Sequence, residues 1–449
     1  MERLFGTDGI RGVANEYPMT ANMALEIGKA TAHIFKKEGH QPRIIVGKDT
    51  RLSGYMIENA LVSGICSMGV DAIQVGPMPT PGIAFLTVNM RVDAGIVISA
   101  SHNPFQDNGI KIFSGDGYKL PDGKEAEIEE MVFANNMHRL YPSPNRLGKA
   151  YRIDGARDRY IVFLKSTFPK EYLLEGTKVV LDCANGATYR VGPATFFELG
   201  AEVATLFDKP NGENINDNCG SQHTEALVKE VLRTKADAGF AFDGDGDRLI
   251  AVDETGSVLT GDQIMAICAR QMKSRGLLRN NLVITTVMSN IGFGIAMKEL
   301  GIDYVTTKVG DRYVLEEMKA RDASLGGEDS GHLIFLNHHT TGDGILSALQ
   351  LMEVVKREGK PLSELVRVMK VYPQKIINVD VKSKPEIMSI PEIARAIEDV
   401  EMKLGDVGRV LVRYSGTQSM CRVMVEGPTD DDTDAYCRVI AEVVREKLA

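Results

Sequence analysis

The sequence predicts an α/β protein made of several domains, with a smaller α+β domain at its C-terminal end. Its 449 residues are too many to fold around one hydrophobic core, and they correspond to about three domains of usual size. Its 44 glycines would supply many short turns between strands and helices. A β-strand, helix, β-strand pattern also recurs three times along the chain, which favours mixed, mainly parallel sheets.

The recurring pattern begins at apolar strands over 43–47, 178–182 and 282–286. After each strand comes a helix, and the helices end near Gly69, Gly200 and Gly301, which fit the left-handed position that closes a helix. The second strands are expected over 72–75, 203–206 and 304–307. Apolar strands joined by a helical crossover are typical of parallel sheets covered on both faces. Three such units predict three related α/β domains.

The last segment has a different pattern. Its expected strands and helices are 375–381, 390–404 (helix), 409–413, 421–426 and 433–448 (helix). An amphipathic helix over 345–358, followed by Pro361, leads into this segment. We therefore predict four domains, at 1–150, 151–253, 254–368 and 369–449.

Charge and composition exclude several classes of partner. The net charge is −9, from 52 basic and 61 acidic residues, which argues against nucleic acid or a membrane surface as a partner. The N-terminal residues lack an apolar signal region, so we expect a cytoplasmic protein. Six scattered cysteines without a Cys-x-x-Cys pair make zinc and a disulfide framework unlikely choices. The sequence leaves a monomer or a homodimer open.

The strongest chemical motif is Asp-Gly-Asp-Gly-Asp-Arg at 243–248. Its glycines let the backbone bend, so that Asp243, Asp245 and Asp247 come close together and require a cation. An EF-hand calcium loop is the competing interpretation, because Glu254 stands at its twelfth position. However, Arg248 occupies the sixth position, where glycine is needed, and the flanks look like strands. We therefore favour Mg²⁺, which takes few carboxylates and completes its shell with phosphate or water.

A second motif, Ser-Ala-Ser-His-Asn-Pro at 99–104, follows a predicted buried strand over 93–98. Ligands of α/β proteins bind at the carboxyl ends of parallel strands, which is where this loop lies. On its own, the Ser-His-Asn triplet at 101–103 is weak evidence for catalysis, and the Gly-x-Ser-x-Gly motif of α/β-hydrolases is missing here. Together with the aspartate motif, this serine motif becomes informative, because an oxygen of a phosphorylated Ser101 could complete the metal site.

Together these motifs resemble the α-D-phosphohexomutases. Further matching segments lie at 6–12, 108–111, 327–332 and 413–417, so that the resemblance extends over the whole chain. It implies four domains arranged around a central cleft, in an enzyme that moves a phosphate between two positions of a hexose phosphate. The phosphate would pass through Ser101 and a sugar bisphosphate, which acts as intermediate and activator. One Mg²⁺ would join Ser101 to the three aspartates.

The resemblance also implies roles for other residues. The catalytic groups expected beside Ser101 are Arg11 and Lys111, which would handle protons or stabilise charge, and His102, which would help to shape the loop; His332 could assist proton transfer or contact the ligand. Lys111 could act as a base only if neighbouring cations lowered its pKa. The groups expected to contact the sugar or its phosphates are Arg248, Glu328, Ser330, Arg413, Ser415, Gly416, Thr417 and Arg422.

The identity of the sugar stays open between two alternatives. Segments 5–11, 210–221 and 286–290 resemble the branch of the family that acts on hexosamine phosphates. Asp329 departs from that branch, which keeps glucose and mannose phosphates possible. A sugar-phosphate-binding protein without catalysis is a third interpretation, and the intact Ser101 and Lys111 argue against it, because binding needs no nucleophile.

Overall fold

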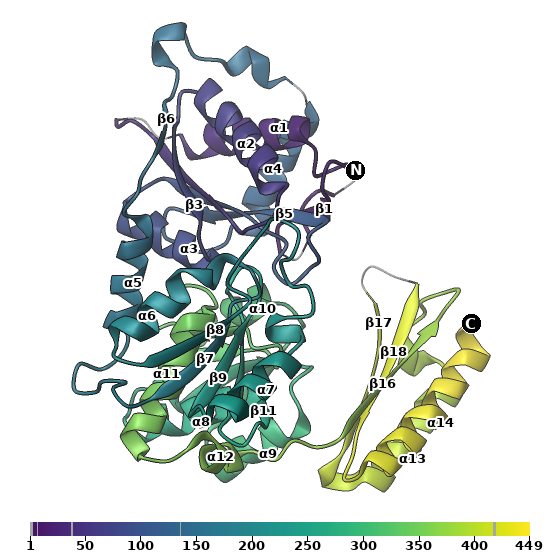
Figure 1. The fold of residues 1–449 in the computed structure, drawn as a ribbon. Helices are drawn as coiled ribbons and strands as arrows, with labels where there is room; N and C mark the ends of the chain where they lie inside the picture. The colour runs from purple at the N-terminus through teal and green to yellow at the C-terminus, as the bar shows by residue number, and fades with distance from the viewer. Residues whose placement is uncertain (1–2, 7, 37–38, 135, 416–418) are drawn as a thin grey trace. The chain divides into compact units, whose positions relative to one another are not determined.

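Four β-sheets follow one another along the chain (Figure 1). The structure is a computed structural model that describes residues 3–6, 8–36, 39–134, 136–415 and 419–449. These residues form two compact units. The first contains residues up to Val287 together with Tyr304–Val366, and the second contains Met288–Asp303 with Arg367–Ala449.

The first sheet has six strands in the order β1-β5-β4-β2-β3-β6. Its central pairs, β2 with β3 and β2 with β4, are parallel, whereas β5 runs antiparallel to β4 and β1. Four helices accompany it, and the apolar side chains of α1, α2 and α4 pack with those of the strands into one core. The elements are β1 (Ile10–Val13), α1 (Ala21–Phe35), β2 (Arg43–Lys48), α2 (Gly54–Ser67), β3 (Asp71–Pro77), α3 (Thr80–Asn89), β4 (Ala94–Ile98), β5 (Asp107–Ser114), α4 (Asp122–Ala134) and β6 (Ala150–Arg152).

The second sheet has five strands in the order β11-β10-β9-β7-β8. Strand β7 is parallel to both of its neighbours, and β10 is antiparallel to β9. The elements are α5 (Ala156–Ser166), β7 (Lys178–Asp182), α6 (Val191–Glu198), β8 (Glu202–Leu206), α7 (Glu225–Thr234), β9 (Ala238–Phe242), β10 (Leu249–Asp253) and β11 (Val258–Leu259). Strands β9 and β10 flank the aspartate motif, and strands in place of helices rule out the EF-hand interpretation.

The third sheet has four strands in the order β13-β12-β14-β15, with β12 parallel to β14 and β14 antiparallel to β15. The elements of this stretch of chain are α8 (Gly261–Ser274), β12 (Leu282–Thr286), α9 (Ile291–Glu299), β13 (Asp303–Thr307), α10 (Asp311–Ala320), β14 (Leu325–Gly327), β15 (Leu333–Phe335), α11 (Gly344–Glu358) and α12 (Leu362–Leu365). The fold class predicted from the sequence, three α/β domains with mixed, mainly parallel sheets, is confirmed.

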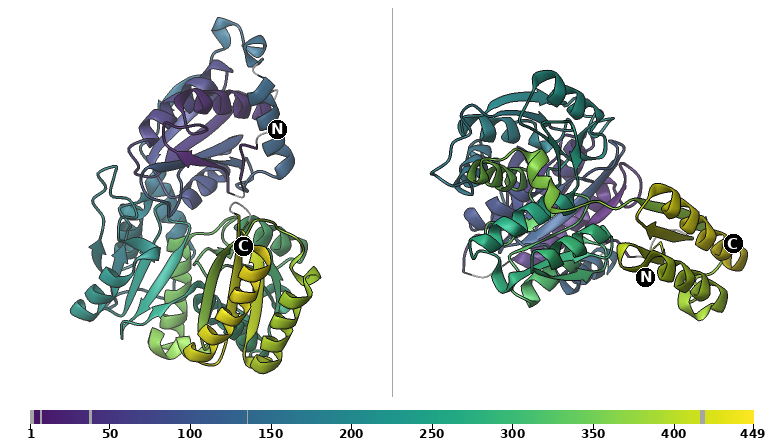
Figure 2. Two further views of the ribbon diagram at one scale, coloured as in Figure 1. Left: turned by 90° about the vertical axis from the view of Figure 1, so that its right-hand side faces the viewer. Right: turned by 90° about the horizontal axis from the view of Figure 1, so that it is seen from below.

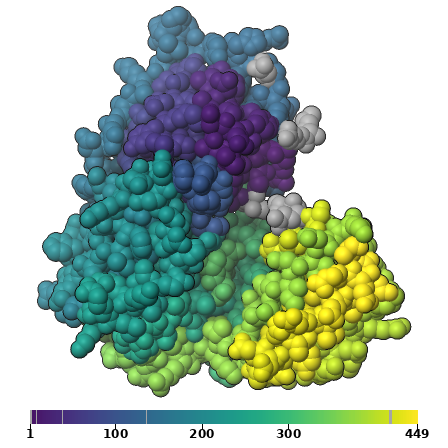
Figure 3. Space-filling model, turned by 45° about the vertical axis from the view of Figure 1, so that its right-hand side comes forward, coloured from purple at the N-terminus to yellow at the C-terminus, as the bar shows by residue number. Residues whose placement is uncertain are grey.

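The C-terminal sheet is antiparallel, in the order β16-β18-β17, and two helices pack on one of its faces (Figures 1 and 2). Its elements are β16 (Gln374–Asp380), α13 (Pro391–Leu404), β17 (Arg409–Tyr414), β18 (Met420–Glu426) and α14 (Asp430–Leu448). In the space-filling view the side chains of this unit, coloured yellow and yellow-green, form a closely packed surface (Figure 3). The antiparallel sheet and its two helices confirm the predicted α+β character of this segment.

Helix α14 begins three residues earlier than the sequence pattern suggests. The Thr429 side chain accepts a hydrogen bond from the Asp432 amide and so caps the helix. The first turn holds three aspartates, whose charge is favourable near the positive end of the helix dipole. The three glycines expected to close helices do so, with φ of 82° at Gly69, 95° at Gly200 and 62° at Gly301.

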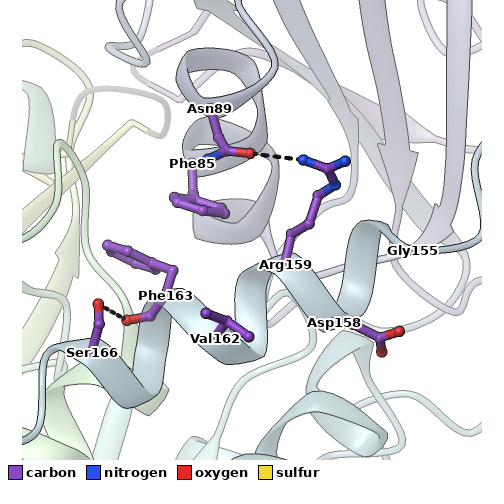
Figure 4. A pocket seen from close by; sticks show the side chains of 8 residues that line it. All are labelled: Phe85, Asn89, Gly155, Asp158, Arg159, Val162, Phe163 and Ser166. Atoms are coloured by element: carbon purple, nitrogen blue, oxygen red, sulfur yellow. Dashed lines mark hydrogen bonds between the residues drawn. The ribbon is translucent and has the colours of Figure 1, made fainter.

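Helix α5 holds the first three sheets together within their unit. The Phe163 ring stacks on the Phe85 ring of α3 with centroids 4.4 Å apart, beside a shallow groove between the two helices (Figure 4). The Tyr160 hydroxyl donates a 2.6 Å hydrogen bond to Asp343, which caps α11. These contacts join α5 to α3 and to the start of α11 within the first unit. Among the described helices, none has the length and apolar character that a membrane span requires.

Candidate active site

The loop of residues 99–104, here called the serine loop, follows strand β4. Ser101 adopts a left-handed backbone conformation with φ of 52°, and the residue is 1% exposed to solvent. Its amide donates to the Ser99 hydroxyl at 3.0 Å, and its own hydroxyl donates to Asp243 Oδ2 at 2.5 Å. The hydroxyl expected to carry a phosphate therefore points directly at the aspartate motif.

The aspartate loop, residues 243–248, joins strands β9 and β10. Asp243, Asp245 and Asp247 are all buried, and one carboxylate oxygen from each lies within 4.8 Å of the other two. Burial, together with the charges of Asp247 and Asp245, raises the pKa of Asp243 well above its ordinary value. Mutual repulsion of this kind is relieved by a cation.

Unused acceptor atoms show that a metal ion fits this cluster. Oδ1 of Asp245 and Oδ1 of Asp247 are buried and accept no hydrogen bond in the described structure. Buried acceptors without a partner are costly, and a hard cation takes carboxylate oxygens as ligands. The three aspartates can therefore hold a divalent metal.

Contacts from three other elements fix the aspartate loop in place. The Thr80 hydroxyl, at the start of α3, donates to Asp245 Oδ2 at 2.7 Å. The amides of Ala187 and Gly344 donate to the carbonyl oxygens of Gly244 and Gly246 at 2.8 and 3.0 Å. The loop thus keeps its shape through the protein itself.

Lys111, on strand β5, supplies positive charge to the cluster. Its Nζ lies 2.9 Å from Asp245 Oδ2, 3.0 Å from Asp8 Oδ2 and 3.6 Å from Asp247 Oδ2, and the side chain is 2% exposed. Burial alone would lower the pKa of Lys111, but the carboxylates of Asp245, Asp8 and Asp247 outweigh it and raise the pKa. The low pKa that a general base needs is not met here, so the ammonium persists and stabilises negative charge.

Arg11 also lies at the serine loop. Its Nη1 donates to the Ala100 carbonyl at 3.3 Å, and its Nη2 pairs with Asp8. Burial alone would raise the pKa of Asp8, yet Lys111, Lys119 and Arg11 hold it well below its ordinary value. Two cations of the predicted site therefore share one anion that the sequence analysis did not select.

Asp8, Lys119 and Asp311 are the residues that sequence reasoning missed. Lys119 Nζ pairs with Asp8 and with Asp311, and thereby links the first domain to the start of α10. Asp8 lies inside the matching segment 6–12, so a sequence clue existed for it. Nothing in the sequence singles out Lys119 or Asp311, because only the fold brings them to the site.

The two predicted histidines lie near Ser101 and the aspartate loop. His102 Nδ1 is 3.4 Å from the Ser101 hydroxyl, and burial, with the nearby charges of Arg248 and Arg11, lowers its pKa to about 4. His332 Nε2 lies 3.6 Å from Asp311 Oδ2 and 3.9 Å from Asp247 Oδ2. Both ring nitrogens of His332 are buried without a hydrogen-bond partner in the described structure, which leaves them available to a ligand.

The predicted sugar loop is the turn between β14 and β15. Glu328 Oε1 accepts from the Gly310 amide at 3.0 Å, and Ser330 is exposed. Arg248 lies nearby, with Nε 3.9 Å from Asp247 Oδ1, and Glu328 is among the anions that raise its pKa against the effect of burial. The structure therefore brings Glu328 close to Arg248, the last residue of the aspartate loop.

The predicted phosphate-binding residues lie in the C-terminal unit, which is described here by itself. Arg413 and Arg422 are directly opposite on β17 and β18, beside a pocket of about 380 Å³. Neither forms an ion pair within the described residues, and burial together with Arg422 lowers the pKa of Arg413. Ser415 follows β17, whereas Gly416 and Thr417 lie outside the described residues. Two facing guanidinium groups without carboxylate partners suit an anion.

Comparison with known proteins covers the whole chain. Models of phosphoglucomutase/phosphomannomutase match in four consecutive parts: alpha/beta/alpha domain I at residues 2–139, domain II at 158–256, domain III at 260–372 and the C-terminal domain at 376–443. Phosphoglucosamine mutase of Syntrophus aciditrophicus is 69% identical, and the match covers 100% of both chains. The enzyme of the same name from Syntrophobacter fumaroxidans is 60% identical over 99% of each chain.

Solved structures share the fold. A phosphoglucomutase/phosphomannomutase family protein from Burkholderia thailandensis has a TM-score of 0.82 at 24% identity, over 99% of this chain and 97% of that one. N-acetylglucosamine-phosphate mutase in its product complex has a TM-score of 0.64 at 15% identity, over 99% and 96% of the two chains. The family resemblance drawn from the motifs is thereby confirmed. The chain belongs to the phosphoglucomutase/phosphomannomutase family, the α-D-phosphohexomutases, and within it to the group of the phosphoglucosamine mutases.

Proposed function

We propose that this enzyme interconverts glucosamine 6-phosphate and glucosamine 1-phosphate, and so feeds UDP-N-acetylglucosamine synthesis. Its relatives, which are named phosphoglucosamine mutases, are 57–69% identical over nearly the full chain. The observation that carries the chemistry is the buried Ser101 hydroxyl, 2.5 Å from an oxygen of Asp243. A phosphate on Ser101 would therefore stand at the edge of the three-carboxylate cluster.

Mg²⁺ is the metal that we propose for Asp243, Asp245 and Asp247. A phosphoserine oxygen and water would complete its shell, as suits a small cation that takes few carboxylates. When bound, the ion neutralises charge on the phosphoryl group. Lys111 and Arg11 add fixed positive charge on the same side of Ser101, because the one contacts the aspartates and the other the Ala100 carbonyl.

In the first half-reaction the free hydroxyl of the sugar attacks the phosphorus of phosphorylated Ser101. The new oxygen–phosphorus bond forms as the bond to Ser101 Oγ breaks, and the attacking hydroxyl loses a proton while Ser101 Oγ gains one. Lys111, which stays protonated, stabilises the charge at Ser101 and is suited to donate rather than accept. We propose His332 as the acceptor, because its ring nitrogens are unpartnered beside Asp247.

The second half-reaction returns a phosphate to the serine. The bisphosphate turns over and Ser101 Oγ attacks its other phosphate. The bond between Oγ and phosphorus forms as the bond from that phosphorus to the sugar oxygen breaks, and Oγ loses the proton it had gained while the sugar oxygen gains one. Arg413, Arg422 and Ser415 would bind the phosphate that is not reacting, with Gly416 and Thr417 in the same loop. Charge-assisted contacts of about 1.5–3 kcal/mol each would keep the intermediate bound between the two halves.

Glu328 and Ser330 are proposed to bind the sugar hydroxyls, with Arg248 beside them. Asp329 is the one residue of that loop that favours a second candidate function, a mutase for glucose or mannose phosphates. A coupled assay that compares the three sugar phosphates decides between the two. Faster turnover of glucose or mannose phosphate would reject the preference for glucosamine.

The covalent role of Ser101 is tested by mass spectrometry and kinetics together. The purified protein should carry one phosphate on the peptide that contains Ser101, and Ser101→Ala should lose both that phosphate and mutase activity. The matched control is Ser63→Ala, an exposed hydroxyl of α2 that bonds only within its own helix. Activity that persists in Ser101→Ala would reject the covalent route.

A further inference from the structure

We infer that Arg51, Asp49 and Asn216 are positioning residues that hold the backbone of the serine loop and so aim Ser101 for phosphate transfer. This inference rests on the proposed covalent role of Ser101. None of the three touches the hydroxyl itself. They act on the backbone that carries it, from two different domains of the first unit.

The Arg51 guanidinium uses all five of its N–H groups in this arrangement. Nη2 donates to the carbonyl oxygens of Ser101 and Asn103 at 3.0 and 2.8 Å. Nη1 donates to the carbonyl oxygens of Pro104 and Asp107, the latter at 3.0 Å. Arg51 is 0% exposed, which is rare for arginine. A fully buried arginine that binds three carbonyls of the serine loop and the carbonyl that begins β5 is an internal template for that loop.

Asp49 completes the arrangement on the amide side of the serine. Its Oδ2 accepts from Arg51 Nε at 2.8 Å and from the Ser99 hydroxyl at 2.6 Å. The same Ser99 hydroxyl accepts the Ser101 amide at 3.0 Å. Arg51 fixes the carbonyl of Ser101, and Asp49 fixes its amide through Ser99. Because the Asp49–Arg51 pair is neutral overall, it adds no net charge beneath the phosphate.

Asn216 binds the same loop from the second domain. Its side-chain amide donates to the carbonyl oxygens of Ser101 and Asn103, each at 2.9 Å. These are the two carbonyls that Arg51 Nη2 binds. The segment around Asn216 matched the family in the sequence, yet the transfer chemistry gives it no task. Its place against the serine loop supplies one.

The conformation of Ser101 explains why so many contacts are needed. A φ of 52° is unfavourable for a residue other than glycine, and such backbone persists only where its surroundings hold it. Relaxation of this φ would turn the Oγ atom away from Asp243. The space beside it is also tight, because a Cβ on Gly244 would lie 2.6 Å from the Ser101 carbonyl oxygen and 2.8 Å from Asn216 Nδ2. Asn216 therefore sets the spacing of the serine loop against the aspartate loop.

The test compares Asn216→Gly with Asn218→Gly. Both asparagines have a left-handed backbone, with φ of 58° and 50°, so glycine fits each position without strain. Among the described residues, the Asn218 side chain bonds to its exposed neighbour Asp217 and not to the serine loop. Phosphorylated protein is mixed with excess glucosamine 6-phosphate, and the rate at which Ser101 loses phosphate is measured in a single turnover. We expect this rate to fall about 10- to 100-fold in Asn216→Gly and to stay within about twofold of wild type in Asn218→Gly.

Hydrogen exchange gives a second readout that needs no activity. The peptide that covers residues 99–104 should exchange faster in Asn216→Gly than in Asn218→Gly. Arg51→Lys keeps the charge but cannot donate to four carbonyls, and it should slow transfer without changing the KM for the sugar phosphate by more than about threefold. Equal transfer rates and equal exchange in the two asparagine variants would overturn the inference, even if Arg51→Lys does not fold.

The same experiment separates this inference from the proposed function. If the wild-type protein carries no phosphate on Ser101, the proposed function fails, and the exchange of residues 99–104 still tests whether Asn216 holds the loop. If Ser101 is phosphorylated and Asn216→Gly transfers at the wild-type rate, only the positioning role fails.

Discussion

Replacing Lys111 by methionine removes a buried ammonium group and leaves a side chain of similar length. In the wild-type protein this ammonium lies within 3.6 Å of the carboxylates of Asp245, Asp8 and Asp247. Asp8 keeps Lys119 and Arg11 as partners, but Asp245 and Asp247 lose a cation that offsets their repulsion. Removal of one partner of a buried ion pair typically costs about 3–5 kcal/mol. We expect a loss of that size in the free energy of unfolding when no metal is present.

Mg²⁺ should reverse part of this loss, because it brings positive charge to the same carboxylates. A ligand at about 100 times its Kd stabilises the folded state by about 2.7 kcal/mol. Without the competing ammonium, Lys111→Met should bind Mg²⁺ more tightly than wild type and gain more stability from it. Its kcat should nevertheless fall, by about 10²- to 10³-fold, because charge at the transferring phosphate is no longer stabilised.

The assay is urea unfolding of both proteins in EDTA and in excess Mg²⁺, followed by circular dichroism. Lys124→Met is the control, because Lys124 pairs with Glu127 on the surface and such pairs contribute at most about 1 kcal/mol. A loss below about 1 kcal/mol in EDTA, or a gain from Mg²⁺ no larger than that of wild type, would refute the electrostatic argument.

Two further predictions concern other parts of the molecule. Arg422→Leu should raise the KM for the sugar phosphate about 10- to 100-fold, which is the equivalent of losing one charge-assisted contact. The control Arg438→Leu, on the exposed face of α14, should leave the KM unchanged. Steady-state kinetics measure both, and an unaltered KM in Arg422→Leu would remove this arginine from the site. His339 is buried, its Nε2 donates to the Pro81 carbonyl, and burial lowers its pKa to about 4. The unfolded chain therefore takes up this proton first, and stability should fall by roughly 3 kcal/mol as the pH drops from about 6.5 to 4. In His339→Gln the loss of stability over this pH range, followed by thermal melting, should be smaller than in the wild-type protein. An identical pH dependence of stability in the two proteins would show that His339 is not the group responsible.

Local sequence determined the elements and the reactive groups. Strands such as β2 and β4 are continuous apolar runs, and a run buried on both faces has few other structures open to it. Gly69 closes its helix because only glycine takes a positive φ without strain. The glycines of the aspartate loop and the carboxylates between them likewise indicate a cation site from composition and spacing alone. These features depend on neighbours in the chain, so they can be read from it.

Tertiary structure decided how those groups work together. Ser101 meets Asp243 across 142 positions of sequence, and Lys119 meets Asp311 across 192. The high pKa of Lys111 depends on carboxylates from two distant loops, so its protonation could not be known before the fold was. Arg51 looks like an ordinary charged residue in the sequence, and only burial against four carbonyls gives it a role. Electrostatic and packing energies depend on distance in space, which spacing along the chain does not fix.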